Sequence, residues 1–369
     1  MKRKIVVSVI SDLVSDQRVH KVCNFLNDNN WDVTLIGRKH KQSLTVEKRY
    51  YKTERIQCVF NKGVLLYAEF MLKLFFRLLT KNPDVFLAND LDTLLPNFLI
   101  SRLKNKKLVY DSHEYFTGVP ELENSRLKKN IWKSLERLIL PKLKIAYTVN
   151  QSIADLYHSQ YGIKMKVVRN VPLLENKTRK METLYPENKT ILLLQGAGIN
   201  EERGAEELVE SMSLLPDNYK LYFIGSGTVW NKLKEMTDRL NLNEKIEFIE
   251  KIPFSKLREY TRQAHLGLSL DKSSCLNYKL SLPNKVFDYI HAGIPVLSSS
   301  VVEVKNIIDG FEVGTTIKDV TASSMAKAIE DVFNNPALYN RWKENTYKAA
   351  ENLCWQKEEK VLEEIFSVL

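Results

Sequence analysis

Three polar residues at the start of a short predicted helix have the types needed to bind a nucleotide. They are Asn284, Lys285 and Asp288, in the segment NYKLSLPNKVFDYIHAGIPVLSSS at 277–300. The free N–H groups and the dipole of a helix N-terminus favour an anion, and Lys285 adds positive charge. Asp288, one turn later, can accept hydrogen bonds from sugar hydroxyl groups. The segment predicts a nucleotide diphosphate site, with an ordinary helix end carrying solvated Lys and Asp as the alternative.

The residues around this motif predict a firmly bounded helix followed by a buried strand. Ser281 is the expected N-cap and Pro283 fits the first turn, so the helix should begin near residue 282. Gly293 can adopt the left-handed conformation that ends a helix. The apolar run at 296–298 then predicts a buried parallel strand.

Glycine-containing turns follow two further predicted strands. Gly196 follows the apolar run 191–194, and Arg203 comes just before a helix expected from about residue 205. Glycine lets the backbone approach a ligand, and arginine can donate two hydrogen bonds to a diphosphate. Gly225 allows a similar close approach at the end of the strand expected at 221–224. A glycine-rich turn alone is weak evidence for a ligand.

The first half of the chain carries two acidic motifs at predicted strand ends. Asp90 and Asp92 form a DxD pair, a spacing that metal-dependent transferases use to hold a cation, although Asp between a strand and a helix is commonly a cap. His113 follows the strand expected at 108–110, in the segment DSHEYFTGVPEL, where parallel sheets often hold ligands. A lone histidine in a loop is more often structural than catalytic.

The segment LPNKVFDYIHAGIPVLSS resembles the carboxy-terminal signature of the GT-B glycosyltransferases of the family 4 type (glycosyl transferases group 1). The segments DQRV, VTLIGR, NDLDTLL and YDSHE look like the amino-terminal domain of the same enzymes, so the resemblance covers nearly the whole chain. It implies that Asp288 replaces the ribose-binding glutamate and that Lys285 and Asn284 lie beside the diphosphate and sugar. By the same resemblance, Arg203 contacts the diphosphate and His113 orients and polarises the donor.

Two departures from the family pattern affect the expected donor site. Leu280 stands where many members carry the first of two glutamates, and Ala197 stands where they carry a first basic residue. Recognition of the donor sugar must therefore come from other groups. The same departures keep open a non-catalytic nucleotide-sugar-binding or scaffold protein of this fold.

The βα alternation and the resemblance together predict an α/β protein of the GT-B fold, with two doubly wound Rossmann-like domains facing a cleft. The expected parts are an acceptor-binding domain at 1–172, a linker at 173–189, a nucleotide-sugar-binding domain at 190–352 and a helix at 353–369 that crosses back to the first domain. The implied reaction is transfer of a glycosyl group to an acceptor hydroxyl with retention of configuration. The nucleotide sugar is the substrate, and no cofactor or metal is expected. A metal-dependent transferase using Asp90 and Asp92, and a nucleotide-sugar epimerase, are the rival enzyme classes.

Charge is distributed unevenly along the 369 residues. Residues 1–172 contain 30 Lys and Arg against 16 Asp and Glu, a net charge of +14, whereas the remainder carries −4. This asymmetry favours an anionic partner for the first half, and a lipid-linked or other glycan acceptor fits better than nucleic acid, for which no binding motif is present. Four widely separated cysteines and the lack of a signal-like N-terminus predict a cytoplasmic protein.

Two segments of the first half leave a membrane hypothesis open. Residues 64–79 are apolar except for three charges, and residues 126–144 form a basic amphipathic helix. The first is too short and too charged to span a bilayer, and packing on a sheet or lying in a membrane interface are the two interpretations. For the second, a solvated face and attraction to anionic lipid carry equal weight. Peripheral contact with the inner face of the membrane is the resulting hypothesis.

Overall fold

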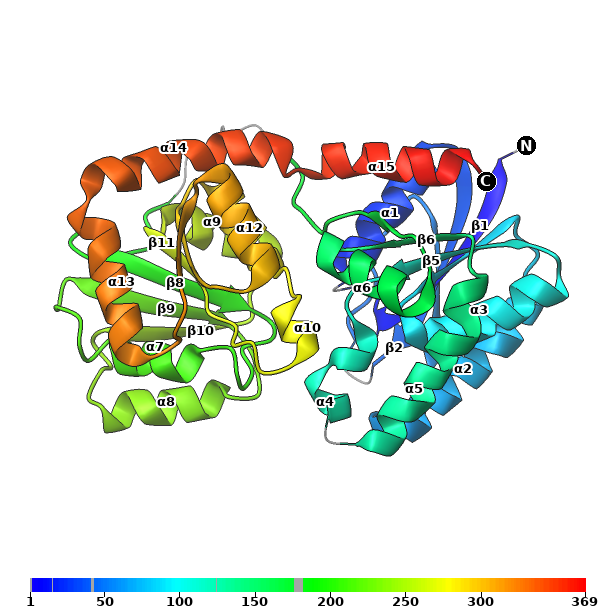
Figure 1. The fold of residues 1–369 in the computed structure, drawn as a ribbon, viewed down its shortest axis with the longest axis horizontal. Helices are drawn as coiled ribbons and strands as arrows, with labels where there is room; N and C mark the ends of the chain where they lie inside the picture. Colours follow the sequence, from blue (N-terminus) through cyan, green and yellow to red (C-terminus); the bar gives the residue numbers. More distant parts are fainter. Residues whose placement is uncertain (1, 15, 41–42, 124, 176–181) are drawn as a thin grey trace. The chain divides into compact units, whose positions relative to one another are not determined.

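The structure is a computed structural model that describes residues 2–14, 16–40, 43–123, 125–175 and 182–369. The chain divides into two compact units (Figure 1). Unit 1 comprises Met1–Asn170 and Glu358–Leu369, and unit 2 comprises Val171–Lys357. The last residues of the chain thus belong to the same unit as the first.

Unit 1 is built on a seven-stranded sheet in the order β3-β2-β1-β4-β5-β6-β7, in which every pair is parallel. The strands are β1 (Arg3–Asp12), β2 (Trp31–Lys39), β3 (Lys52–Gln57), β4 (Val85–Asn89), β5 (Lys107–Ser112), β6 (Ile145–Thr148) and β7 (Lys166–Val167). The helices are α1 (Gln17–Asp28), α2 (Gly63–Leu79), α3 (Leu91–Leu103), α4 (Pro120–Glu123), α5 (Arg126–Ile139), α6 (Gln151–Tyr161) and all but the first three residues of α15 (Trp355–Ser367), with short 3-10 turns at Phe116–Gly118 and Leu140–Lys142.

Helix α2 packs on this sheet through one row of side chains. Leu66, Phe70, Leu74 and Leu78 recur every four residues, are buried, and share a core cluster with strand residues of β1 to β4. Of the two interpretations of this segment, the structure therefore shows packing on the sheet for one face of the helix. No helix in the described part of the chain is long and apolar enough to cross a membrane.

Unit 2 contains a six-stranded parallel sheet in the order β10-β9-β8-β11-β12-β13. The strands are β8 (Thr190–Gly196), β9 (Tyr219–Gly225), β10 (Ile246–Glu250), β11 (Leu266–Ser269), β12 (Val296–Ser299) and β13 (Gly314–Ile317). The helices are α7 (Ala205–Ser211), α8 (Trp230–Arg239), α9 (Phe254–Gln263), α10 (Leu276–Lys279), α11 (Asn284–Ala292), α12 (Val302–Phe311), α13 (Ala322–Asn334) and α14 (Pro336–Asn352).

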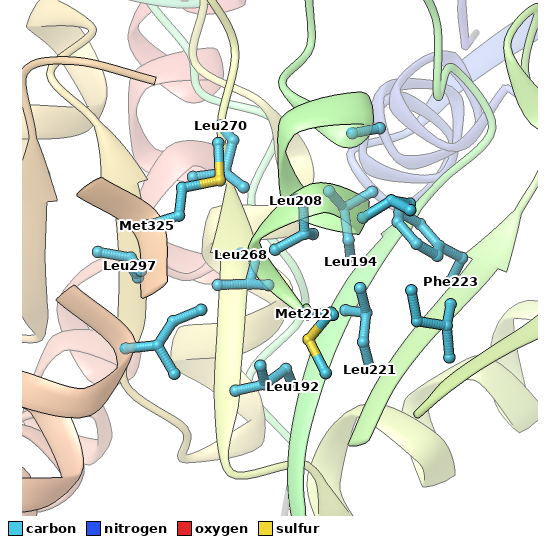
Figure 2. Packing of buried hydrophobic residues seen from close by; sticks show 14 of the residues in the cluster. Leu192, Leu194, Leu208, Met212, Leu221, Phe223, Leu268, Leu270, Leu297 and Met325 are labelled. Atoms are coloured by element: carbon cyan, nitrogen blue, oxygen red, sulfur yellow. The ribbon is translucent and has the colours of Figure 1, made fainter. Parts of the chain in front are cut away.

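Both faces of the second sheet are buried, as a parallel sheet between helices requires. Alternate residues of β8 enter different cores: Leu192 and Leu194 pack with α7 and α13, while Ile191 and Leu193 pack with α11 and α12. Figure 2 shows the first of these cores, where Leu192, Leu194, Leu208 and Met212 lie close together. The two layers hold the carboxyl ends of the strands rigidly at one edge.

Helix α11 begins two residues later than expected. Pro283 is its N-cap, with an extended ψ of 136°, and the helix starts at Asn284. The prediction that Ser281 caps the helix is wrong, because the Ser281 hydroxyl instead donates to the carbonyl of Tyr278 in the preceding turn. Gly293 ends the helix in the left-handed conformation, with φ of 80°, as expected.

The segment expected to be a linker, 173–189, packs partly on unit 2. Its residues 176–181 lie outside the described residues. Tyr185 is buried, and its ring lies 4.6 Å from that of Tyr222 in the core of unit 2. An aromatic residue in a polar stretch was the only sequence signal for this contact.

Gly225 is required by the packing of two strand ends. A Cβ at this position would lie 1.8 Å from the carbonyl oxygen of Gly196, and φ is 144°. The adjacent Ser226 N–H donates to the same carbonyl at 3.1 Å. The ends of β8 and β9 can therefore approach this closely only because residue 225 has no side chain. This packing role is independent of any contact between Gly225 and a ligand.

We predict that Gly225→Ala destabilises the protein by about 3 kcal/mol, because the clash is with rigid backbone. Gly310→Ala is the matched control, since Gly310 is in helix α12 and a Cβ there meets nothing within 4 Å. That substitution should stabilise by about 1 kcal/mol through helix propensity. Urea unfolding followed by circular dichroism measures both, and equal midpoints for the two variants would contradict the packing account.

Candidate functional site

Two clusters of charged residues lie at the carboxyl ends of the two sheets. In unit 2 the strand order reverses between β8 and β11, which are neighbours in the sheet. Ligands of open α/β sheets bind beyond the carboxyl ends of the strands at such a reversal. Gly196 ends β8 at this point, Arg203 lies in the turn that follows, and Asp271 comes two residues after β11.

Arg203 is held by a buried carboxylate and an aromatic ring. Its Nη1 donates to Oδ2 of Asp271 at 2.9 Å, and its guanidinium carbon lies 4.5 Å from the ring centroid of Tyr278. Asp271 is only 2% exposed. Neither Oδ1 of Asp271 nor Nε of Arg203 has a hydrogen-bond partner among the described residues, although both atoms are buried. Each retains a hydrogen-bonding position that a bound molecule could use.

Lys285 approaches the same carboxylate from the first turn of α11. The pKa of Lys285 lies below its ordinary value, and burial is the largest cause. The charge of Asp271 opposes this shift, and the charge of Arg203 adds to it. A Cβ built on Gly196 would lie 4.0 Å from Cε of Lys285, so the lysine side chain passes beside the end of β8. Arg203, Lys285 and Gly196 are thus brought together around Asp271.

The other two donor-binding candidates of α11 lie on different sides of this cluster. Asn284 is exposed at the first position of the helix. Asp288 is half-buried and accepts a hydrogen bond from Nε2 of Gln195 at 3.3 Å. It also lines a pocket of about 270 Å³ with Thr261 and Arg258 of α9. Asp288 therefore lies next to the end of β8 and remains accessible from a pocket.

In unit 1 the strand order reverses between β1 and β4, and the charged cluster lies beside that point. His113 follows β5, and its backbone N–H donates to Oδ1 of Asp90 at 2.8 Å. Its ring nitrogens contact three groups: Nδ1 lies 3.4 Å from Asp90, and Nε2 lies 3.3 Å from Asp111 and 3.1 Å from Oδ1 of Asn89. The predicted candidate His113 thus joins the ends of β4 and β5.

The charges around His113 keep it protonated. Burial alone would lower the pKa of His113, but Asp90 and Asp111 outweigh burial and raise the pKa to about 9. Burial would raise the pKa of Asp111, but Arg18 and His113 lower it to about 2. At neutral pH the ring is an imidazolium that donates from both nitrogens.

Arg18 supports this cluster from helix α1. It donates from Nε and Nη2 to the two oxygens of Asp111 at 3.0 and 2.7 Å, and from Nη1 to the carbonyl of Val168. Arg18 is 3% exposed, so it is a buried structural arginine and not a solvated one. Asp16 is the N-cap of α1, accepting from the N–H of Val19.

Of the two DxD carboxylates, Asp90 is bonded within the protein and Asp92 is buried with no partner for its Oδ1 among the described residues. Asp90 has φ of 58° and bonds to His113, while Asp92 is buried in the first turn of α3. Burial and the charge of Asp90 raise the pKa of Asp92 well above its usual range. In the described ranges, no group of three or more His, Cys, Asp or Glu residues is arranged to hold a metal ion.

Sequence reasoning missed Asp271. Its position two residues after an apolar strand, in SLDKSS, was the available signal, but Asp beside a strand end is common in loops. Its pairing with Arg203 joins residues 68 positions apart, which no local pattern reveals.

Comparison with known proteins gives two family matches in adjacent parts of the chain. Residues 16–172 match the model described as Glycosyltransferase Family 4, and residues 176–349 match Glycosyl transferases group 1. The chain is 21% identical to a chitobiosyldiphosphodolichol beta-mannosyltransferase from Candida glabrata, over 96% of this chain and 89% of that protein.

Two solved structures share the fold at low sequence identity. A sucrose-phosphate synthase from Thermosynechococcus elongatus has a TM-score of 0.80 and 15% identity, covering 100% of this chain and 99% of that chain. The Anabaena protein HepE in complex with UDP-glucose has a TM-score of 0.72 and 13% identity, covering 99% and 100%. These likenesses show two parallel-sheet Rossmann-like domains of the GT-B type.

We predict that His113 titrates with a midpoint near 9 in the folded protein. Because this pKa lies above the ordinary value of 6.5, the stabilisation is complete below pH 6.5 and is lost as the pH rises from 6.5 through 9. A histidine-detected NMR titration measures the midpoint. His265 is the internal reference of opposite sign, since burial and Lys343 lower its pKa. A His113 midpoint below 6.5 would contradict the ion-pair geometry.

Proposed function

We propose that this chain, which belongs to the GT-B glycosyltransferases of the family 4, group 1 type, transfers a sugar. The sugar passes from a nucleotide-sugar donor to an acceptor hydroxyl group. The finer parts of the proposal are that transfer retains the anomeric configuration and needs no metal. The nucleotide sugar is a substrate, and no resident cofactor takes part.

The observation that carries the proposal is the cluster of Arg203, Lys285 and Asp271 at the carboxyl edge of the second sheet. Arg203 pairs with the buried carboxylate of Asp271, and Lys285 lies within electrostatic range of both, so these three groups hold an excess of one positive charge when all are ionised. The N-terminus of α11, whose N-cap Pro283 makes no side-chain hydrogen bond, lies at the same edge, and a helix N-terminus favours an anion. A diphosphate is the part of a nucleotide sugar that such a cluster would stabilise.

Stabilisation of the leaving diphosphate is the proposed source of catalysis. Negative charge develops on the diphosphate as its bond to the sugar breaks, and fixed cations facing that charge lower the barrier. Arg203 and Lys285 supply these cations, and backbone at Gly196 allows close approach. Asp288, beside the end of β8, would accept hydrogen bonds from the ribose.

His113 would orient the donor sugar rather than act as a nucleophile. Its imidazolium donates to protein carboxylates from both nitrogens, so it has no lone pair available for attack. One of these hydrogen bonds can be shared with a donor hydroxyl or phosphate oxygen. Asn284, exposed at the start of α11, would contact the donor sugar in this proposal.

The acceptor is proposed to be a glycan or a lipid-linked glycan in surface polysaccharide assembly, with the reaction in the cytoplasm. Support for an anionic acceptor, such as a lipid-linked phosphate, comes from the net charge of +14 in residues 1–172. The relative from Candida glabrata is described as acting on a diphosphodolichol-linked sugar, which fits this class.

A scaffold protein that binds a nucleotide sugar without turnover is the second candidate. Two observations favour it: Arg203 is already paired with Asp271, and Ala197 and Leu280 replace residues that the family uses. Such a protein would bind donor but release no nucleoside diphosphate in the presence of acceptor. An epimerase would instead convert the donor sugar without acceptor.

We predict that one of the UDP-, GDP-, ADP- and CMP-sugars raises the melting temperature by a few degrees with EDTA present. UDP-glucose is the first to test, because HepE is solved with it. Arg203→Ala with Lys285→Ala should abolish the shift, since both diphosphate cations are lost. Differential scanning fluorimetry measures the effect.

Lys232→Ala is the matched control, because Lys232 pairs with Glu206 at the surface of the same unit. It should keep the full shift. No shift with any donor would contradict the site. Binding that returns only with manganese, and that Asp90→Asn removes, would instead support the metal-dependent class.

Asp271 supplies a second, finer prediction about the donor sugar. Its unpaired Oδ1 can accept a hydrogen bond from a sugar hydroxyl, a role that Leu280 cannot fill. Losing a hydrogen bond to a charged group lowers kcat/KM by about 10- to 100-fold. In wild type, a deoxy donor lacking that hydroxyl should show this loss. Asp271→Asn keeps an amide oxygen acceptor but loses the charge, so the preference for the natural donor should be smaller in this variant, and an undiminished preference would contradict the role.

A further inference from the structure

The outer face of helix α2 in unit 1 is apolar and exposed. Its inner row packs on the sheet, whereas Leu65, Leu72, Phe76 and Leu79 are 59%, 58%, 58% and 40% exposed. These positions are separated by seven, four and three residues, so they form one stripe on the side opposite Leu74. A soluble helix packed on a sheet normally presents polar residues there.

Helix α5 shows the same feature. Leu127, Ile131 and Leu138 are 73%, 49% and 53% exposed and are separated by four and seven residues. The opposite side of the helix carries Trp132 and Glu136, which are buried. The exposed side chains again form one stripe that faces away from the unit.

Helix α3 joins these two stripes. It contacts both α2 and α5, and the three helices lie side by side in Figure 1. Leu99 and Leu103, one turn apart near its end, are 46% and 70% exposed. The rings of Tyr67 in α2 and Trp132 in α5 meet at 5.3 Å beneath this surface. We call these nine exposed side chains of α2, α3 and α5 the apolar face.

The charges on these helices are almost all positive. Their cations are Lys73, Arg77, Arg102, Arg126, Lys128, Lys129, Lys133 and Arg137. Of their three carboxylates, Asp92 and Glu136 are buried, and Glu69 is occupied by Lys73 and by the N–H groups of Val59 and Phe60. On α5, helical spacing places Lys128 to one side of the apolar stripe and Arg137 to the other. An apolar centre is therefore flanked by cations, with no exposed carboxylate on these helices free to oppose an anionic surface.

From this arrangement we infer that the apolar face docks on an anionic lipid bilayer. The leucine and phenylalanine side chains enter the boundary between headgroups and acyl chains, while Lys and Arg extend to the phosphates. A second copy of the chain fits worse, because a two-fold contact would place the cations of one face against those of the other. The inference goes beyond the sugar-transfer proposal and does not depend on donor turnover.

Vesicle sedimentation tests the inference on the full chain. Wild type should bind vesicles of phosphatidylcholine with 30% phosphatidylglycerol, and binding should weaken in 0.5 M NaCl as the charges are screened. Leu72→Gln with Phe76→Gln should weaken partitioning by about tenfold or more, because two exposed apolar groups no longer enter the membrane. Lys128→Glu should weaken it by about fivefold or more, since each cation near an anionic surface contributes about that factor.

Two controls separate this result from loss of folding or of donor binding. Leu214→Gln replaces a leucine that is 56% exposed in unit 2 and should leave vesicle binding unchanged. The α2 variant should keep the wild-type melting temperature and the wild-type response to donor.

Three outcomes would overturn the inference. Wild type could fail to bind the anionic vesicles, or Leu214→Gln could lower binding as much as the α2 variant does. Alternatively, wild type could be a dimer by light scattering that the α2 substitutions convert to a monomer, which would assign the apolar face to a second copy. Failure of vesicle binding with intact donor binding would leave the sugar-transfer proposal standing.

Discussion

The proposed donor site depends on one interaction, the ion pair between the buried carboxylate of Asp271 and Arg203. A carboxylate that is 2% exposed is costly unless it is paired, and Arg203 provides that pairing. The pairing holds the turn after β8 at the reversal of the sheet, and the charge of Asp271 also acts on Lys285 in α11. Because two cations lie near one anion, this cluster leaves positive charge at the edge where a diphosphate would bind.

The cluster around His113 in unit 1 also pairs cations with carboxylates, but in equal numbers. Arg18 and protonated His113 face Asp111 and Asp90, so two cations meet two carboxylates. This cluster is close to neutral, and it fixes the histidine ring in one orientation. The excess of cations in unit 2 is the basis for proposing the diphosphate site there, and the nearly neutral cluster in unit 1 is the basis for proposing that His113 acts on a less charged group.

Sequence periodicity and the family resemblance were enough to predict the βα alternation, the GT-B fold and the helix that starts at the PNK motif. Local rules failed where a contact joins distant residues. The pairing of Arg18 with Asp111 joins residues 93 positions apart, and that of Asp271 with Arg203 joins residues 68 positions apart, so no local pattern predicts either. Ser281 matched an N-cap pattern, but its hydroxyl donates to the carbonyl of Tyr278 in α10 instead. Strand β3 escaped notice because KTERIQ alternates only weakly in polarity.

We propose that Arg203 and Lys285 hold the diphosphate of a nucleotide. Calorimetric titration with the diphosphate, the monophosphate and the free nucleoside of one base, in EDTA, measures what each phosphate contributes to binding. We expect affinity to fall by about tenfold or more with each phosphate removed, because each removal loses a charge-assisted contact. Equal affinity for the nucleoside and its diphosphate would show that the base alone is recognised and that the two cations do not hold the diphosphate.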